Sequence, residues 1–95
     1  MTAYLIAIRN STSDAEGLAA YNAAAGQTFV DGMQVLARGS ARAEALEGPP
    51  LEGVVIVKFD DFESAKAWYE GPGYQKAREH RLPAADYRFI LVEGL

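Results

Sequence analysis

Cysteine is absent from the 95 residues of this sequence, and histidine occurs only once. Without cysteine the chain has no disulfide framework and no thiolate chemistry, and a single histidine is too few for a conventional structural zinc site. We therefore expect a protein with no metal site and no cofactor.

Positive charge is also scarce. Nine lysines and arginines stand against thirteen aspartates and glutamates, which gives a formal net charge of -4 at pH 7. A folded surface with this balance repels phosphate backbones and anionic lipid headgroups on average. The composition therefore predicts a protein that binds neither nucleic acid nor a membrane surface.

Long hydrophobic runs are missing as well. The apolar stretches of the sequence fall far short of the ~20 residues that span a bilayer. The short N-terminal run at residues 3–8 follows no basic segment and leads to no small-residue cleavage site, so it is typical of a strand and not of a signal peptide. We expect a cytoplasmic protein.

Apolar residues make up 49% of the chain, which is enough for one compact core but leaves little for a second. We therefore expect one domain over residues 1–95. The segments with the alternation or the β-branched content of strands are residues 3–9, 33–39, 53–59 and 86–93. Residues 41–46 are expected to prolong the second strand as an exposed arm.

A helix is predicted between the first two strands. Ser13 and Glu16 have the S-x-x-E spacing of a capping box. Gly32 suits the left-handed residue that ends many helices. The first helix is therefore expected to begin at Ser13 and to end near Gly32.

A second helix is predicted after the third strand. Asp60 or Asp61 caps it, and capping is a better explanation of this pair than a divalent-metal site. The turn at residues 71–73 interrupts the helix, and a short helix over residues 74–81 follows.

This order, strand-helix-strand-strand-helix-strand, normally folds into a ferredoxin-like α+β domain, a four-stranded antiparallel sheet with two main helices on one face. The third strand is apolar on both sides, with Val55, Val57 and Phe59 on one and Val54 and Ile56 on the other. The helices of one chain cover only one side, and burying apolar area is worth roughly 25 cal/mol per Å². We therefore expect a homodimer that pairs through the open sheet face.

Several short segments together resemble one family over nearly the whole chain. They are Leu36-Ala37-Arg38-Gly39, Leu46-Glu47-Gly48, Val55-Ile56-Val57-Lys58-Phe59 with Phe62-Glu63-Ser64-Ala65, Ala67-Trp68-Tyr69, Tyr74-Gln75, Arg81, and Leu91-Val92-Glu93-Gly94. The family is DUF1330, a domain of unknown function. The resemblance implies a dimeric α/β barrel of the ferredoxin-like kind and implies no activity. The sequence departs from the family pattern at Gly71-Pro72-Gly73 and at Ser40, which replaces a second glycine.

Two groups of residues are candidates for a ligand site. Arg38 ends the second predicted strand beside Ser40, where a guanidinium suits a ligand carboxylate; the alternative is an ion pair within the chain or across a dimer interface. Trp68, Tyr69 and Tyr74 are spaced to wall a pocket for a flat ligand between the second helix and the sheet, as in related barrels. The alternative is that these rings belong to the core.

The segment from Arg78 to Arg81 supplies two further candidates. His80 has a glutamate beside it and could act as an acid or a base near neutral pH; the alternative is a solvated residue on a charged helix. Arg81 matches the family pattern, and the alternative role for an arginine at a helix end is to bind the last carbonyl groups.

These residues predict a site for a small organic carboxylate or aromatic molecule, for binding alone or for catalysis, in a cleft between sheet and helices. The alternative is a non-catalytic dimeric assembly module. An RNA-recognition domain shares the order of elements, but it stacks bases on aromatic residues of strand three. Here that strand is Val-Val-Ile-Val in an acidic chain, which excludes this class.

Overall fold

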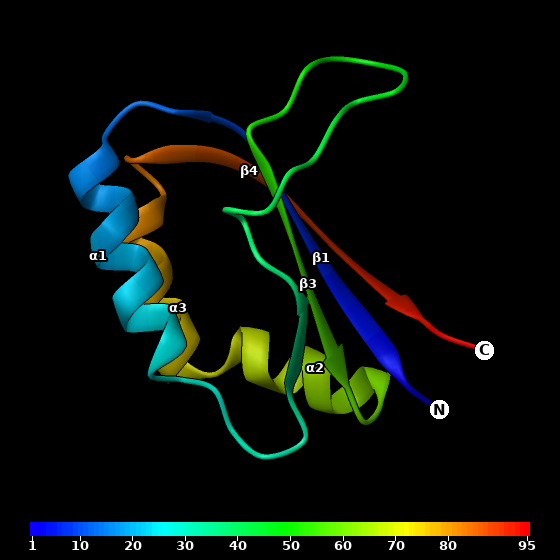
Figure 1. The fold of residues 1–95 in the computed structure, drawn as a ribbon. Coiled ribbons are helices and arrows are strands. Elements are labelled where there is room, and N and C mark those ends of the chain that lie inside the picture. The colour runs from blue at the N-terminus through cyan, green and yellow to red at the C-terminus, as the bar shows by residue number, and fades with distance from the viewer.

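A computed structural model describes all residues, 1–95, and confirms the predicted α+β order (Figure 1). The elements in chain order are β1 (Ala3–Thr12), α1 (Ala15–Gly26), β2 (Gln34–Ala37), β3 (Gly53–Phe59), α2 (Phe62–Glu70), α3 (Pro72–Arg81) and β4 (Ala85–Glu93). None of the helices has the length and apolar character needed to cross a membrane.

The four strands form one antiparallel sheet in the order β2-β3-β1-β4. β1 lies inside the sheet, where Ile6 is paired with Ile56 of β3 and with Ile90 of β4. The sheet is open, with β2 and β4 at its edges. A single chain therefore does not close a barrel.

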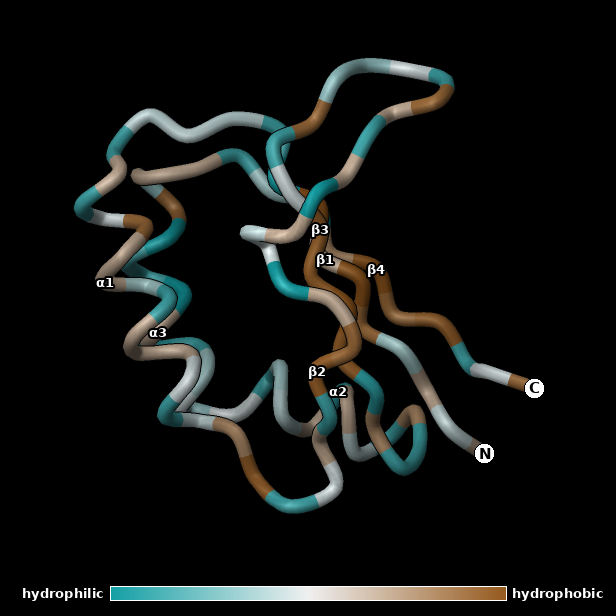
Figure 2. The backbone as a smooth tube through the Cα atoms, viewed as in Figure 1, coloured by the Kyte–Doolittle hydropathy of each residue, from teal (hydrophilic) through white to brown (hydrophobic).

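The helices all lie on one side of this sheet (Figure 1). Facing them, the β1 and β3 residues Leu5, Val57 and Phe59 are buried and pack with Ala65 of α2. The opposite face carries a second apolar row, in which Val92 is exposed and the other residues are partly buried; these are Tyr4, Ile6, Ile8, Val54, Ile56 and Ile90. Figure 2 shows the same concentration of hydrophobic residues in the strands. The two-sided apolar character predicted from the sequence is confirmed.

Helix α1 begins and ends at residues other than those predicted. Asp14 is its N-cap and accepts hydrogen bonds from the backbone N–H groups of Glu16 and Gly17. The Ser13 hydroxyl instead donates to backbone carbonyls of the segment before β4. The helix ends at Gly26, and Gly32, with φ of 94°, lies in the turn before β2. A tertiary contact thus removes Ser13 from the cap.

The second helix begins where the sequence predicted, but the interruption after it is shorter than predicted. Asp61 caps α2, its carboxylate accepting from the Ser64 N–H at 2.7 Å. That hydrogen bond is the main reason why the pKa of Asp61 lies below its ordinary value. Gly71 separates α2 from α3, and Pro72 is the first residue of α3 instead of part of a turn, because proline suits the first helical turn.

Residues 38–52 form a long loop and not the predicted continuation of β2. A register shift between Val35 and Ala37 ends the regular pairing of β2 with β3. The loop returns to the sheet at Glu52, whose N–H donates to the carbonyl of Arg9. Figure 1 shows it projecting beyond the end of the sheet.

Candidate ligand-binding cavity

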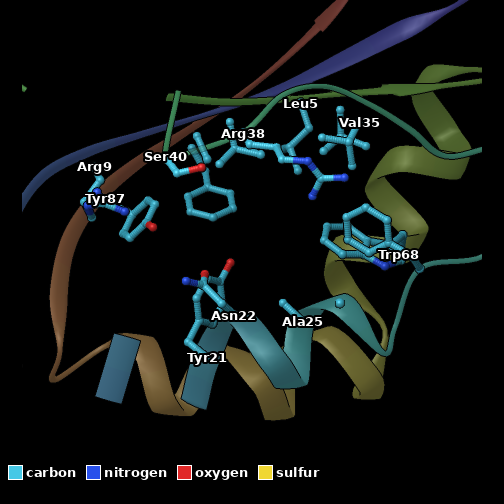
Figure 3. Close-up of a pocket in the computed structure, with 17 residues that line it drawn as sticks. Leu5, Arg9, Tyr21, Asn22, Ala25, Val35, Arg38, Ser40, Trp68 and Tyr87 are labelled. Atoms are coloured by element: carbon cyan, nitrogen blue, oxygen red, sulfur yellow. The ribbon is translucent and has the colours of Figure 1, made fainter. Parts of the chain in front are cut away.

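A cavity of about 590 Å³ lies between the helix-facing side of the sheet and α1 (Figure 3). Seventeen residues line it, of which eleven are hydrophobic, and all four strands and α1 contribute. Its volume is in the range of pockets that enclose a small organic molecule.

The cavity exists because α1 rests on α3 and not on the sheet. Tyr21 and Ala25 of α1 form a buried cluster with Tyr74 and Ala77 of α3. α2, in contrast, packs directly against β1, β3 and β4. The cavity therefore lies mainly under the first helix, whereas the sequence predicted a pocket between the second helix and the sheet; of α2 only Trp68 lines it.

Small residues face this space from both sides. Ala7 of β1 and Gly39 of the loop after β2 contribute to the sheet wall, and Ala25 and Gly26 contribute to the helix wall. Larger side chains at these positions would fill the volume. The cavity is therefore encoded by residue size on elements that are far apart in the sequence.

Rings of Tyr21, Tyr87, Phe89 and Trp68 form the aromatic wall of the cavity. The Tyr87 ring lies 6.1 Å from the ring of Tyr21 and 5.6 Å from that of Phe89, measured between centroids. At the other end lies Trp68, whose indole N–H donates to the carbonyl and the hydroxyl of Thr28, each at 3.1 Å. These contacts hold the rings in fixed orientations, as a site for a flat apolar group requires.

The polar side chains that line the cavity carry positive charge or none. They are Arg9, Asn22, Arg38 and Ser40, together with the Tyr21 and Tyr87 hydroxyls, and no aspartate, glutamate, histidine or lysine lines it. Figure 3 shows the Arg38 side chain extending into the cavity towards the end with Trp68. Arg38 takes part in no ion pair, because the only ion pair of the chain joins Arg9 to Glu52.

Arg81 lies behind the aromatic wall and is 5% exposed. Its guanidinium carbon is 4.5 Å from the centroid of the Phe89 ring, 5.3 Å from that of Tyr87 and 5.7 Å from that of Tyr21. Its Nε atom is buried without a hydrogen-bond partner, and no carboxylate forms an ion pair with it. The rings offset part of the cost of burying this charge.

Two tyrosine hydroxyls are paired beside this arginine. The Tyr21 and Tyr74 oxygens are 2.8 Å apart. Burial raises the pKa of both hydroxyls, against the opposing effect of the Arg81 charge. Both side chains therefore keep their protons at neutral pH.

The structure separates the predicted site residues into three groups. Arg38, Ser40 and Trp68 line the cavity. Tyr69, Tyr74 and Arg81 do not line it; the Tyr74 ring packs between those of Trp68, at 4.5 Å, and Tyr69, at 5.1 Å. His80 is exposed on α3. Tyr74 and Arg81 lie on α3, whose inner face packs on α1 and supports the aromatic wall from behind.

Most of the lining residues were not named as candidates from the sequence, and among them are the polar or aromatic residues Arg9, Tyr21, Asn22, Tyr87 and Phe89. The three strand residues could have been predicted from the sequence. The alternation of side chains along a strand puts Arg9, Tyr87 and Phe89 on the same side of the sheet as the buried Leu5. No local signal marks Asn22, since its place depends on how α1 is oriented over the sheet.

A family model described as "Domain of unknown function (DUF1330)" matches residues 2–95 of the chain. No curated protein matches it. Among solved structures, a protein of unknown function from Rhodopseudomonas palustris has a TM-score of 0.72 and 25% identity, and the similarity covers 99% of this chain and 82% of that one.

Two further structures share the fold. A dimeric ferredoxin-like protein of unknown function from Thermobifida fusca has a TM-score of 0.64 and 14% identity, over 99% of this chain and 92% of its own. SnoaB, a cofactor-independent oxygenase from Streptomyces nogalater, has a TM-score of 0.60 and 12% identity, over 98% of this chain and 91% of its own. At these identities the similarity concerns the fold alone.

Proposed function

Because the chain belongs to the DUF1330 family, whose description assigns no activity, the function must be argued from its cavity, and we propose that it binds a small organic acid there. The ligand has a flat apolar body and a carboxylate. The observation that carries the proposal is an unpaired arginine, Arg38, that lines an apolar cavity free of carboxylates.

The two parts of the ligand follow from the two kinds of wall. The rings of Tyr87, Phe89 and Trp68 supply the surface for the apolar body. The guanidinium of Arg38 supplies paired donors that match a carboxylate. A carboxylate would therefore pair with Arg38 without competition from an acidic residue of the lining.

Chemistry on the ligand is a separate question from binding. One neighbour in fold is described as a cofactor-independent oxygenase, and at 12% identity that similarity supports only the fold. The proposal is therefore confined to binding. The alternative, an assembly module with no ligand, predicts instead that Arg38 pairs with an acidic residue of a partner and that no small acid binds in the cavity.

Isothermal titration calorimetry with 2-naphthoate tests the proposal. The matched probe 2-naphthamide has the same ring system and no charge. We expect Arg38→Gln to weaken 2-naphthoate binding by about tenfold or more, since a hydrogen bond to a charged group is worth ~1.5–3 kcal/mol, and to leave 2-naphthamide binding unchanged. Arg42→Gln is the control, because Arg42 is exposed in the loop and does not line the cavity.

Other small organic acids are tested beside 2-naphthoate, because the acid that binds best can have a different ring system. Benzoate, cyclohexanecarboxylate and indole-3-acetate are added in a thermal-shift measurement. If no acid in the panel raises the melting temperature and 2-naphthoate gives no heat of binding, the proposed function is wrong.

A second proposal concerns assembly: two copies pair through the open sheet face. The partly exposed apolar row of that face, including Ile6, Ile56 and Ile90, would gain burial against a matching surface. Two of the solved structures with this fold are described as dimeric. Light scattering tests it, since a dimer has twice the 10.3 kDa mass of one chain.

A further inference from the structure

An arginine lines each end of the cavity, Arg38 at one end and Arg9 at the other. At the end with Trp68 the charge is that of Arg38, which forms no ion pair (Figure 3). No carboxylate lines any part of the cavity. An anionic group at this end is already part of the proposed function.

The opposite end holds Arg9 next to Tyr87, its partner across the strands β1 and β4 (Figure 3). The Arg9 Nε atom lies 3.4 Å from Glu52 Oε1, and the Thr12 hydroxyl donates to the same oxygen at 2.6 Å. Glu52 is 44% exposed and does not line the cavity. This pair is therefore partly screened by solvent, and it occupies only the Nε edge of the guanidinium.

The terminal nitrogens of Arg9 are held beside the backbone of two glycines. A Cβ atom built on Gly39 would lie 3.5 Å from Nη1, and one on Gly53 would lie 3.3 Å from Nη2. The guanidinium thus lies against the backbone of the sheet and of the loop after β2, at the cavity wall. The ion pair with Glu52 and these close contacts fix its position.

Arg81 adds a second charge behind the same end. Its guanidinium lies over the Tyr87 ring at 5.3 Å, is buried, and has no acidic partner. Arg9 and Arg81 thus place two guanidinium groups near Tyr87. Glu52 pairs with Arg9, and Asp86 accepts a hydrogen bond from Asn10, but neither carboxylate lines the cavity.

We propose that the ligand is a diacid, with an acidic group at each end of its apolar body: one pairs with Arg38 and the other with Arg9. The inference rests on the proposed function and narrows its ligand class. The Arg9 end would attract the second acid through the terminal nitrogens of Arg9 and the field of Arg81 behind the rings. A monoacid would pair with only one of these two guanidinium groups.

The experiment compares two probes that differ in one carboxylate, 2-naphthoate and naphthalene-2,6-dicarboxylate, by calorimetry on the full chain. We expect the wild type to bind the diacid about tenfold or more tightly than the monoacid, with a ratio that falls as salt is raised. Arg9→Gln should reduce the ratio to one or below while 2-naphthoate still binds.

Two variants test whether the preference for the diacid depends on the Arg9 guanidinium or only on the net charge of the chain. The double variant Arg9→Gln with Glu52→Gln keeps the net charge of the chain, and it should lose the preference for the diacid just as the single variant does. Arg42→Gln removes one positive charge from the exposed loop and should keep the preference. The ratio of diacid affinity to monoacid affinity is measured on the wild type alone, so it tests the inference even if Arg9→Gln does not fold.

The outcomes distinguish this inference from the proposed function. If 2-naphthoate binds through Arg38 and the diacid binds no better, the inference is wrong and the proposed function stands. A preference for the diacid that survives in the double variant also overturns it. If neither probe nor any acid of the panel binds, both proposals are wrong.

Discussion

The buried pair of tyrosine hydroxyls gives the most sharply defined prediction for stability. Tyr21 and Tyr74 lie on different helices, and their oxygens are 2.8 Å apart. Tyr21→Phe removes one hydroxyl and leaves that of Tyr74 without this partner in a side chain that is 1% exposed. Tyr74→Phe leaves the hydroxyl of Tyr21, a residue that is 7% exposed and lines the cavity, where we expect the hydroxyl to turn towards water.

The two single variants should therefore differ in cost. A buried polar group left without a partner costs ~1–3 kcal/mol, so we expect about 2 kcal/mol for Tyr21→Phe and about 1 kcal/mol for Tyr74→Phe. In the double variant no hydroxyl is left unsatisfied, and its cost should be near 1 kcal/mol. The cycle then gives a coupling of about 2 kcal/mol, within the usual range for residues in contact.

Thermal unfolding followed by circular dichroism measures these differences at one fixed protein concentration. For a domain of this size, 1 kcal/mol lowers the melting temperature by roughly 4–8 °C. Additive effects within ~0.5 kcal/mol would refute the reasoning, as would a larger cost for Tyr74→Phe than for Tyr21→Phe. Tyr69→Phe is the matched control, because no hydrogen bond joins its hydroxyl to this pair.

The same pair predicts a pH dependence. Burial raises the pKa of Tyr21 and of Tyr74 in the folded state above the ordinary tyrosine value of about 10. The contribution of these two protonated hydroxyls to the free energy of unfolding is fully present below pH ~10 and is lost as the pH rises further. The reason is that the tyrosines of the unfolded chain ionise at a lower pH than those of the folded chain. The double Phe variant should lose less stability than the wild type between about pH 9 and pH 11.

The structure also predicts the outcome of four further substitutions. Asp61→Ala should lower the melting temperature at pH 7, and the difference should shrink as the pH falls towards the depressed carboxyl pKa, where the cap becomes protonated in the wild type; a difference that grows as the pH is lowered would contradict this. Gly53→Ala places a Cβ atom 2.5 Å from the Gly39 carbonyl oxygen and should destabilise, whereas Gly26→Ala meets open space and should stabilise by up to ~1 kcal/mol; thermal unfolding of both checks the sign. Ile6→Lys on the open sheet face should halve the mass seen by light scattering, and a wild type that is already monomeric would refute the pairing.

The order of the elements and the two-sided apolar strands were readable from the sequence, because both depend on local patterns. Alternation and β-branched runs located all four strands to within a few residues of their observed bounds. The carboxylate of Asp61 caps α2 by accepting a hydrogen bond from the backbone N–H three residues later. This contact is local, so an aspartate just before a predicted helix is enough to indicate it. Arg38, Ser40 and Trp68 were named from the sequence and do line the cavity.

The cavity itself was decided by the tertiary structure. Its volume depends on α1 resting on α3 through the cluster of Tyr21 and Tyr74, a contact between segments 53 residues apart. That contact lifts α1 from the sheet, brings Arg9 and Tyr21 to the lining, and buries Arg81 without a counter-ion. No local pattern encodes the distance between a helix and a sheet, since side-chain packing across the chain sets it.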